Sequence, residues 1–445
     1  MAFCFGVEQA IGMEKAKPIS ILELLRARQT WLLVGLIFLG RMAYFLYWGT
    51  LLEIDSLGYL KFQTALYHPP LYSAFNGLAI QIGRSVDAIV VAQSLLYSIC
   101  AGALIRRWGR SGKMQLVLAI FLALEPCSGK LACTVMAETV FLSLLMLAWI
   151  ALPTLKAENW KRLSLAAIWM GCMLGLAYQT RYAAPVFVVA VFIWMLTQRL
   201  PWRHLALGTG IILLAFQFSL LPLRMYYQVR FGTMQTNAFS SLSLWNTSAY
   251  LYPDSRIATE PKTEFERYLK CFPAADYDLY HTWHTNQMFH DSLAFQRFVK
   301  ENHLKTSEIQ AAANSAGATA RKLLWASPIR HLREFVWPNV QRPFSGEDMI
   351  YSNLLPAHID APLHFHNRHL HYYWSESWWA IFGLLLVSTG LQLRYRKRVP
   401  AYAGLLLLSC WLYLLGIAGL VYLLAPIVVI AIGLQVETIL QPKQD

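Results

Sequence analysis

The sequence predicts an all-α protein that crosses a membrane about ten times, with interfacial helices in the first outer loop and a mixed, mainly helical outer domain. Of the 445 residues, 56% are hydrophobic and only 14% are charged, which leaves too little polar surface for a water-soluble chain. Many of the apolar residues form uninterrupted runs near the length that spans a bilayer. The basic residues gather in the short segments between these runs, as in membrane proteins whose basic loops stay in the cytoplasm.

The apolar runs predict spans over approximate limits. The first follows a mixed-charge arm without the apolar core of a cleavable signal, so we expect it to act as its own insertion signal. The expected spans are 31–49, 87–105, 114–129, 131–152, 163–180, 183–198, 205–226, 376–393, 400–416 and 417–436.

Basic clusters predict which loops face the cytoplasm. They lie in the N-terminal arm, at Arg106–Lys113, around Arg162, near Arg199 and at Arg394–Arg398. All these clusters can lie on the same side of the membrane only if residues 70–84 do not cross the bilayer. That run is too short to span it. We therefore expect an interfacial helix there, both termini in the cytoplasm, and residues 50–86 and 227–375 outside.

The same reasoning predicts four parts of the chain. Residues 227–373 hold 14 Lys or Arg against 13 Asp or Glu, so the formal net charge of +13 comes almost wholly from short loops and does not indicate a nucleic-acid partner. Within this region, "ATARKLLWASPIRHLREFVWPNV" predicts two short amphipathic helices broken before Pro328. The parts are a cytoplasmic arm (1–30), a transmembrane domain of about seven spans (31–226), an outer domain (227–375), and C-terminal transmembrane helices with a short tail (376–445).

Ionisable residues gather where the predicted spans reach the outer face. A long Lys or Arg side chain at such a place can extend to the lipid headgroups, whereas a carboxylate has too short a stem to do so. Carboxylates together with cations suit transfer from a phosphate-bearing substrate, because a carboxylate accepts a proton while cations offset charge on the leaving phosphate. The residues are Glu53, Asp55, Lys130, Glu138, Arg181, Arg224 and Arg230, with Arg41 deeper inside the first span, where a structural pairing and a lipid contact are both open.

The position of these charges at the outer face limits which class of donor substrate can reach them. Nucleotide-activated donors are not supplied outside the cytoplasm, and the sequence has no glycine pattern of the Walker or Rossmann type. A donor that reaches an outer-face site within the membrane is lipid-linked, which a polyprenyl-phosphate sugar satisfies.

Several stretches then resemble, in order, those of the superfamily-C (GT-C) integral-membrane glycosyltransferases, particularly the protein O-mannosyltransferase and aminoarabinose-transferase-like branch. The first is an acidic residue after the first span with an aromatic one turn later, followed by "HPPLY". The others are "VAQSLLYSICAGALIRRWG", "LALEPCSGKLACTVMAETVFLSLLMLAW", "GLAYQTRYAAPV", "LPLRMYYQVRFG" and "RKLLWASPIRHLREFVW".

The resemblance implies roles for particular residues. Asp55 falls on the family's catalytic acidic residue, and Tyr59 shares its face if that stretch is helical. The family often has an adjacent Asp-Glu pair and a longer gap to the His-Pro-Pro step, whereas Ile54 separates the two carboxylates here, so Glu53 stays open as the base. Glu138 falls on a second carboxylate that positions substrate or another side chain. The cations implied for the lipid phosphate are Arg181, Arg224 and, as a weaker candidate, Lys130.

The resemblance thus implies a transferase that moves a sugar from a polyprenyl-phosphate donor to a glycan, lipid or protein acceptor, with inversion and without cofactor or metal. We expect it in a bacterial inner membrane with the site facing the periplasm. A transporter or flippase for a lipid-linked or anionic envelope substrate is the alternative, but no internal repeat is evident in the sequence. A histidine run could ligate zinc, but an interfacial aromatic belt is favoured there; it contains His364, His366, His369 and His371.

Overall fold

The computed structural model describes most of the predicted membrane region and part of the predicted outer region. The described residues are 27–52, 54–60, 69–109, 111–156, 159–198, 200–231, 234, 245, 248, 251, 301–303, 306–333, 355–356, 383–395, 403–410 and 425–440. The chain divides into two compact units. The first comprises Met1–Gln63, Pro69–Ser219 and Asn353–Asp445, and the second comprises Thr64–His68 and Leu220–Ser352.

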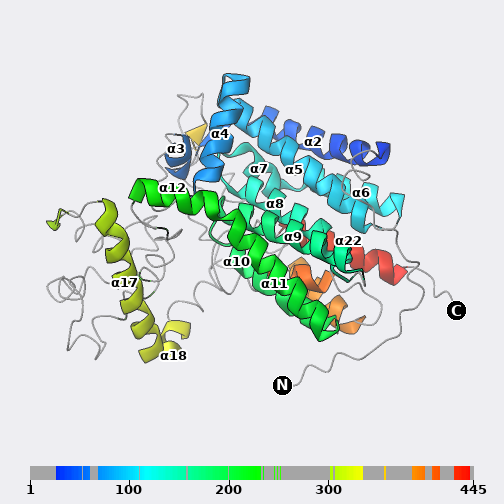
Figure 1. The fold of residues 1–445 in the computed structure, drawn as a ribbon. Helices are drawn as coiled ribbons and strands as arrows, with labels where there is room; N and C mark the ends of the chain where they lie inside the picture. The colour runs from blue at the N-terminus through cyan, green and yellow to red at the C-terminus, as the bar shows by residue number, and fades with distance from the viewer. Residues whose placement is uncertain are drawn as a thin grey trace. The chain divides into compact units, whose positions relative to one another are not determined.

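The first unit is a bundle of helices (Figure 1). α2 packs against α5, α6 and α7, while α5 packs against α8, α8 against α9, and α9 against α11. The elements are α2 (Arg28–Trp48), β1 (Leu51–Leu52), α3 (Ile54–Leu60), α4 (Pro70–Gly83), α5 (Asp87–Trp108), α6 (Gly112–Leu124), α7 (Pro126–Cys133), α8 (Glu138–Ile150), the 3-10 helix η1 (Leu152–Lys156), α9 (Trp160–Tyr178), α10 (Ala184–Thr197), α11 (Trp202–Ser219), β2 (Leu355–Pro356) and α22 (Ala425–Leu440), with further helix over 383–394 and 403–410.

Four described helices are long and apolar enough to cross a membrane: Arg28–Trp48, Asp87–Trp108, Glu138–Lys156 and Trp202–Val229. Three shorter apolar helices accompany them. Large apolar side chains such as Leu39, Leu214 and Phe218 are exposed on these helices, as expected of surfaces that face lipid. The prediction of an all-α polytopic membrane protein is confirmed. Within the described residues the only sheet is formed by β1 and β2, two strands of two residues each. The number of spans stays a prediction.

The third and fourth predicted spans have different limits in the structure. We expected helices over 114–129 and 131–152, but α6 ends at Leu124, a short helix α7 follows, and α8 begins only at Glu138. Proline lacks an amide hydrogen and disfavours helical backbone in the residue before it. Glu125, which precedes Pro126, accordingly adopts an extended conformation (φ −64°, ψ 117°). The kink moves the turn into the fourth span from the neighbourhood of Lys130 to residues 134–137.

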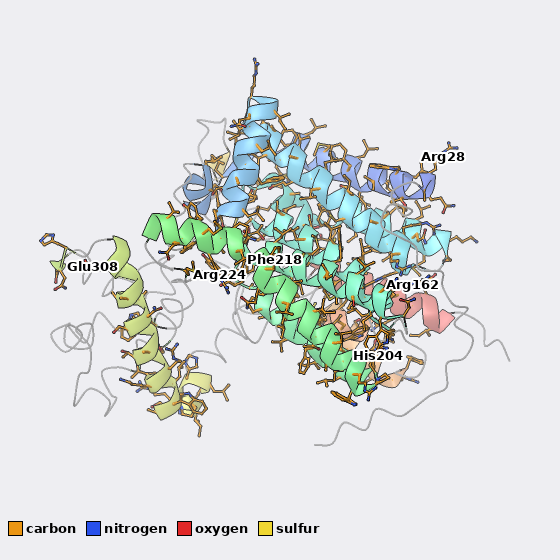
Figure 2. The ribbon with its side chains drawn as sticks, viewed as in Figure 1. Arg28, Arg162, His204, Phe218, Arg224 and Glu308 are labelled. Atoms are coloured by element: carbon orange, nitrogen blue, oxygen red, sulfur yellow. The ribbon has the colours of Figure 1, made fainter. Side chains whose placement is uncertain are left out.

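Several basic helix starts lie at one end of the first unit. Figure 2 labels Arg28 at the start of α2, Arg162 at the start of α9 and His204 at the start of α11, and all three lie at the same end of the bundle. β1 and α3 lie at the opposite end (Figure 1). This separation agrees with the basic clusters from which we predicted the cytoplasmic side.

The described part of the second unit contains α12 (Leu221–Phe231), α17 (Thr306–Ala326) and α18 (Pro328–His331). One side of α17 is buried through Ala313, Ala316, Ala320 and Leu323, a spacing that places them on one helix face. The prediction of two helices broken before Pro328 is confirmed, because α17 ends at Ala326 and α18 begins at Pro328.

Candidate functional site

The segment that carries Asp55 is fastened to the turn before α8. The amide of Val135 donates to the carbonyl oxygen of Leu51 at 3.0 Å. The hydroxyl of Ser56, the neighbour of Asp55, donates to the carbonyl oxygen of Val135 at 2.8 Å and is buried. β1 also pairs antiparallel with β2, Leu51 opposite Pro356. These bonds hold the start of α3 at a defined place beside the N-terminal end of α8.

α3 satisfies the condition that linked Asp55 to Tyr59. Both residues lie within the helix Ile54–Leu60, so they are one turn apart on one face. Tyr59 is buried, and its ring meets the ring of Tyr72 edge to face with 4.8 Å between centroids. The side chain of Asp55 and the whole of Glu53 lie outside the described residues.

A buried polar chain joins α4 to the turn before α8. The hydroxyl of Tyr72 donates to Gln93 Oε1 at 3.0 Å, and Gln93 Nε2 donates to the carbonyl oxygens of Ala132 (2.7 Å) and Thr134 (2.8 Å). Burial raises the pKa of Tyr72 well above its ordinary value, and the nearby Tyr59 and Glu138 raise it further. The phenol therefore stays protonated and acts as a hydrogen-bond donor.

The described part of the site contains one ion pair, between Glu138 and Arg181. Glu138 is the first residue of α8 and only 1% exposed, and the amide dipoles at a helix start favour a negative charge there. Arg181 lies between α9 and α10, and its side chain is 26% exposed. The pair gives the buried carboxylate a counter-charge, while the arginine side chain stays partly exposed.

Two further cations are buried beside the site. Lys130 lies on α7 and is 3% exposed; its carbonyl oxygen accepts a hydrogen bond from the hydroxyl of Thr134 at 3.0 Å. Arg41, fully buried in α2, donates to Ser128 Oγ at 2.6 Å and to the carbonyl oxygen of Glu125 at 3.3 Å. The two roles left open for Arg41 were pairing with an acidic residue and a lipid contact, whereas its hydrogen-bond partners are a serine hydroxyl and backbone carbonyl oxygens inside the bundle. The hydrogen bonds of Arg41 connect α2 to the kink between α6 and α7.

The structure brings most of the predicted residues into one region of the first unit. One backbone bond and one bond from the Ser56 hydroxyl join the segment at the start of α3 to the turn that separates α7 from α8, and the ion pair joins α8 to Arg181. Arg224 is different, since it lies half-buried on α12 of the second unit and is labelled there in Figure 2. The four histidines of the 364–371 run lie outside the described residues.

Sequence reasoning missed two residues of the buried polar chain. Tyr72 closes the "HPPLY" stretch, but nothing in its position singled it out from the neighbouring aromatic residues. Gln93 lies inside an apolar span, where a polar side chain needs a partner. That isolated glutamine was the available signal, although only the fold identifies its partners.

A comparison with known protein families adds an independent finding. Residues 67–223 match the model of the dolichyl-phosphate-mannose-protein mannosyltransferase family. The matched segment includes Tyr72, Gln93, Lys130, Glu138 and Arg181, while β1 and α3 precede it. The match confirms the resemblance to superfamily-C glycosyltransferases over this segment and supports a membrane glycosyltransferase of that type. The curated proteins and the solved structures contain no significant match.

Proposed function

We propose that this protein is an integral-membrane glycosyltransferase that moves a sugar from a polyprenyl-phosphate-linked donor to an acceptor at the outer face of the membrane. The family match over residues 67–223 supports a sugar donor carried on a lipid phosphate, because the family is named for such a donor. The acceptor is a glycan, a lipid or a protein. The proposed location is the inner membrane of a bacterial envelope, with the site facing the periplasm.

The observation that carries the proposal is the attachment of α3 to the turn before Glu138. The bonds from Val135 to Leu51 and from Ser56 to Val135 fix the helix that holds Asp55. A catalytic base must stay within hydrogen-bond reach of the proton it removes, so a loop fastened on its backbone suits that role. The same turn leads directly into the buried ion pair of Glu138 with Arg181.

In the proposed reaction, Asp55 accepts the proton of the acceptor hydroxyl as its oxygen bonds to the anomeric carbon of the donor sugar. The bond from that carbon to the phosphate oxygen breaks, and polyprenyl phosphate leaves with the electron pair. The sugar inverts because attack and departure occur on opposite sides. A single base with cations opposite it supplies this arrangement, and Glu53 is the alternative base.

The proposed phosphate contacts come from Arg181, with Lys130 as a further cation, while the role of Arg224 stays a prediction from the resemblance. A guanidinium has five N–H donors in a planar fork, so Arg181 can bind Glu138 on one side and phosphate oxygens on the other. Glu138 then acts by orienting Arg181. Tyr59 supports the face of α3 that carries Asp55, since its ring packs on Tyr72.

The test of the base compares Asp55→Asn with Glu53→Gln in one turnover assay. The purified full chain is supplied with polyprenyl-phosphate sugars, and release of polyprenyl phosphate is measured. The amide keeps the shape of Asp55 but removes the basic oxygen, so turnover should fall by about 100-fold or more while donor binding is retained. The effect of Glu53→Gln should be far smaller.

Two other outcomes would change the assignment of the base. An active Asp55→Asn protein beside an inactive Glu53→Gln protein would assign the base to Glu53. Two active variants would exclude a catalytic role for this loop.

A further inference from the structure

The corner between α17 and α18 exposes three large apolar side chains. Trp325 is 85% exposed, Ile329 is 80% exposed and Leu332 is 60% exposed. The opposite side of α17 is buried in the second unit through Ala316, Ala320 and Leu323. The exposed set is therefore not the packed face of the helix, and it costs free energy in water.

The three side chains lie within eight residues of the chain, on both sides of the corner. The amide of Ser327 donates to the carbonyl oxygen of Leu323 at 3.0 Å, and the amide of His331 donates to that of Ser327 at 3.0 Å. These two bonds bridge the break before Pro328, but Ser327 itself departs from helical geometry (φ −139°, ψ 54°), so the chain turns a corner there. Ile329 and Leu332 are three residues apart and share a face after the corner, while Trp325 is the last residue but one of α17 before it.

The same corner is strongly basic. The stretch from Arg321 to Arg333 contains four Lys or Arg and no Asp or Glu. Arg321 and Arg333 are exposed, and Lys322 and Arg330 are half-buried. Exposed apolar residues that include a tryptophan, flanked by basic residues, are typical of a segment that lies in a membrane interface.

We propose that this corner is a membrane-docking surface for a bilayer that contains anionic phospholipid. Trp325, Ile329 and Leu332 enter the boundary between headgroups and acyl chains, and Arg321 and Arg333 contact lipid phosphates. The positive charge selects an anionic lipid surface over a neutral apolar partner. The inference concerns how the second unit meets the membrane, and it does not depend on the proposed reaction.

The test places a spin label at Ile329 through Ile329→Cys in the full chain reconstituted into vesicles. The vesicles contain phosphatidylcholine alone or phosphatidylcholine with phosphatidylglycerol. Collisions of the label with oxygen, which concentrates in the bilayer, are compared with collisions with a water-soluble nickel chelate. The matched control is Glu308→Cys, an exposed position in the first turn of α17. The unsubstituted chain, treated identically, measures labelling of native cysteines.

We expect oxygen collisions to exceed nickel collisions at residue 329 in the anionic vesicles, and the reverse at residue 308. Trp325→Cys and Leu332→Cys should repeat the result for 329, so the conclusion does not depend on one variant. The combined changes Arg321→Gln and Arg333→Gln, or the neutral vesicles, should shift the label at 329 towards water.

Three outcomes would overturn the proposal. Nickel collisions at 329 as frequent as at 308 would show a face open to water. Shielding from both reagents would show a face covered by protein. An oxygen preference that responds neither to the arginine changes nor to lipid charge would rule out recognition of anionic lipid.

Discussion

Glu138 and Arg181 form a buried ion pair at the candidate site. The carboxylate begins α8, the arginine follows α9, and the pair forms only because α8 and α9 pack together. If Glu138 orients Arg181 for the donor phosphate, the two residues contribute both to stability and to turnover. Variants can separate these contributions.

At this scale we predict that Glu138→Gln and Arg181→Gln each lower the free energy of unfolding by about 3–5 kcal/mol, because each leaves a charge without its partner. The double variant should regain much of that loss, since two amides can hydrogen-bond to each other without buried charge. Turnover should stay low in all three, because the guanidinium for the phosphate is absent or misplaced. Thermal unfolding in detergent and polyprenyl-phosphate release are the measurements. Turnover restored in the double variant would reduce Arg181 to a structural counter-ion.

Among the elements, the α9–α11 pair depends on close approach of two helices. Gly171 of α9 faces the backbone of α11, where an added Cβ would lie 2.7 Å from the Cβ of Ala215 and 3.0 Å from the backbone nitrogen of Phe216. Real side chains essentially never approach so closely, so a Cβ there must push the helices apart. The contact matters for the site because α9 leads directly to Arg181.

We therefore predict that Gly171→Ala destabilises the protein by about 1–3 kcal/mol, as overpacking does. The matched control is Gly210→Ala on α11, where an added Cβ meets no atom within 4 Å. That control should be neutral or stabilising by up to about 1 kcal/mol, because alanine favours helix over glycine. Unfolding temperatures in one detergent compare the two variants. Equal effects would mean that close approach at Gly171 is unimportant.

On the scale of the whole molecule, the gathering of basic helix starts at one end of the first unit supports a single orientation in the membrane. Arg28, Arg162 and His204 share that end, and α3 lies at the other (Figures 1 and 2). With the basic end in the cytoplasm, the loop that carries Asp55 would face outside.

We predict that a membrane-impermeant maleimide labels Glu308→Cys in intact spheroplasts and labels Lys113→Cys only after permeabilisation. Both positions are exposed, so accessibility depends on the side of the membrane and not on burial. The unsubstituted chain controls for native cysteines. Labelling of Lys113→Cys in intact spheroplasts would reverse the topology, and the proposed outer-face reaction with it.

The sequence by itself determined the membrane class, the helical pattern and the positions at which charge is conspicuous. These follow from local properties, since apolar length, basic loops and proline breaks act over a few residues. It predicted the break before Pro328, and it left open whether the stretch that carries Asp55 and Tyr59 is helical, which the structure shows it to be. It also predicted that Glu138 and Arg181 would be important, but not that they would bind each other.

Only the tertiary structure decided which distant residues meet. The bond between Ser56 and Val135 joins residues 79 positions apart, and Arg41 reaches Ser128 across 87. The start of α8 at Glu138 was missed because residues 131–137 are mostly apolar, so the turn at 134–137 gives no local signal that separates it from a span. Partners across such separations depend on how whole helices pack, and helix packing is a property of the assembled bundle that local sequence patterns do not specify.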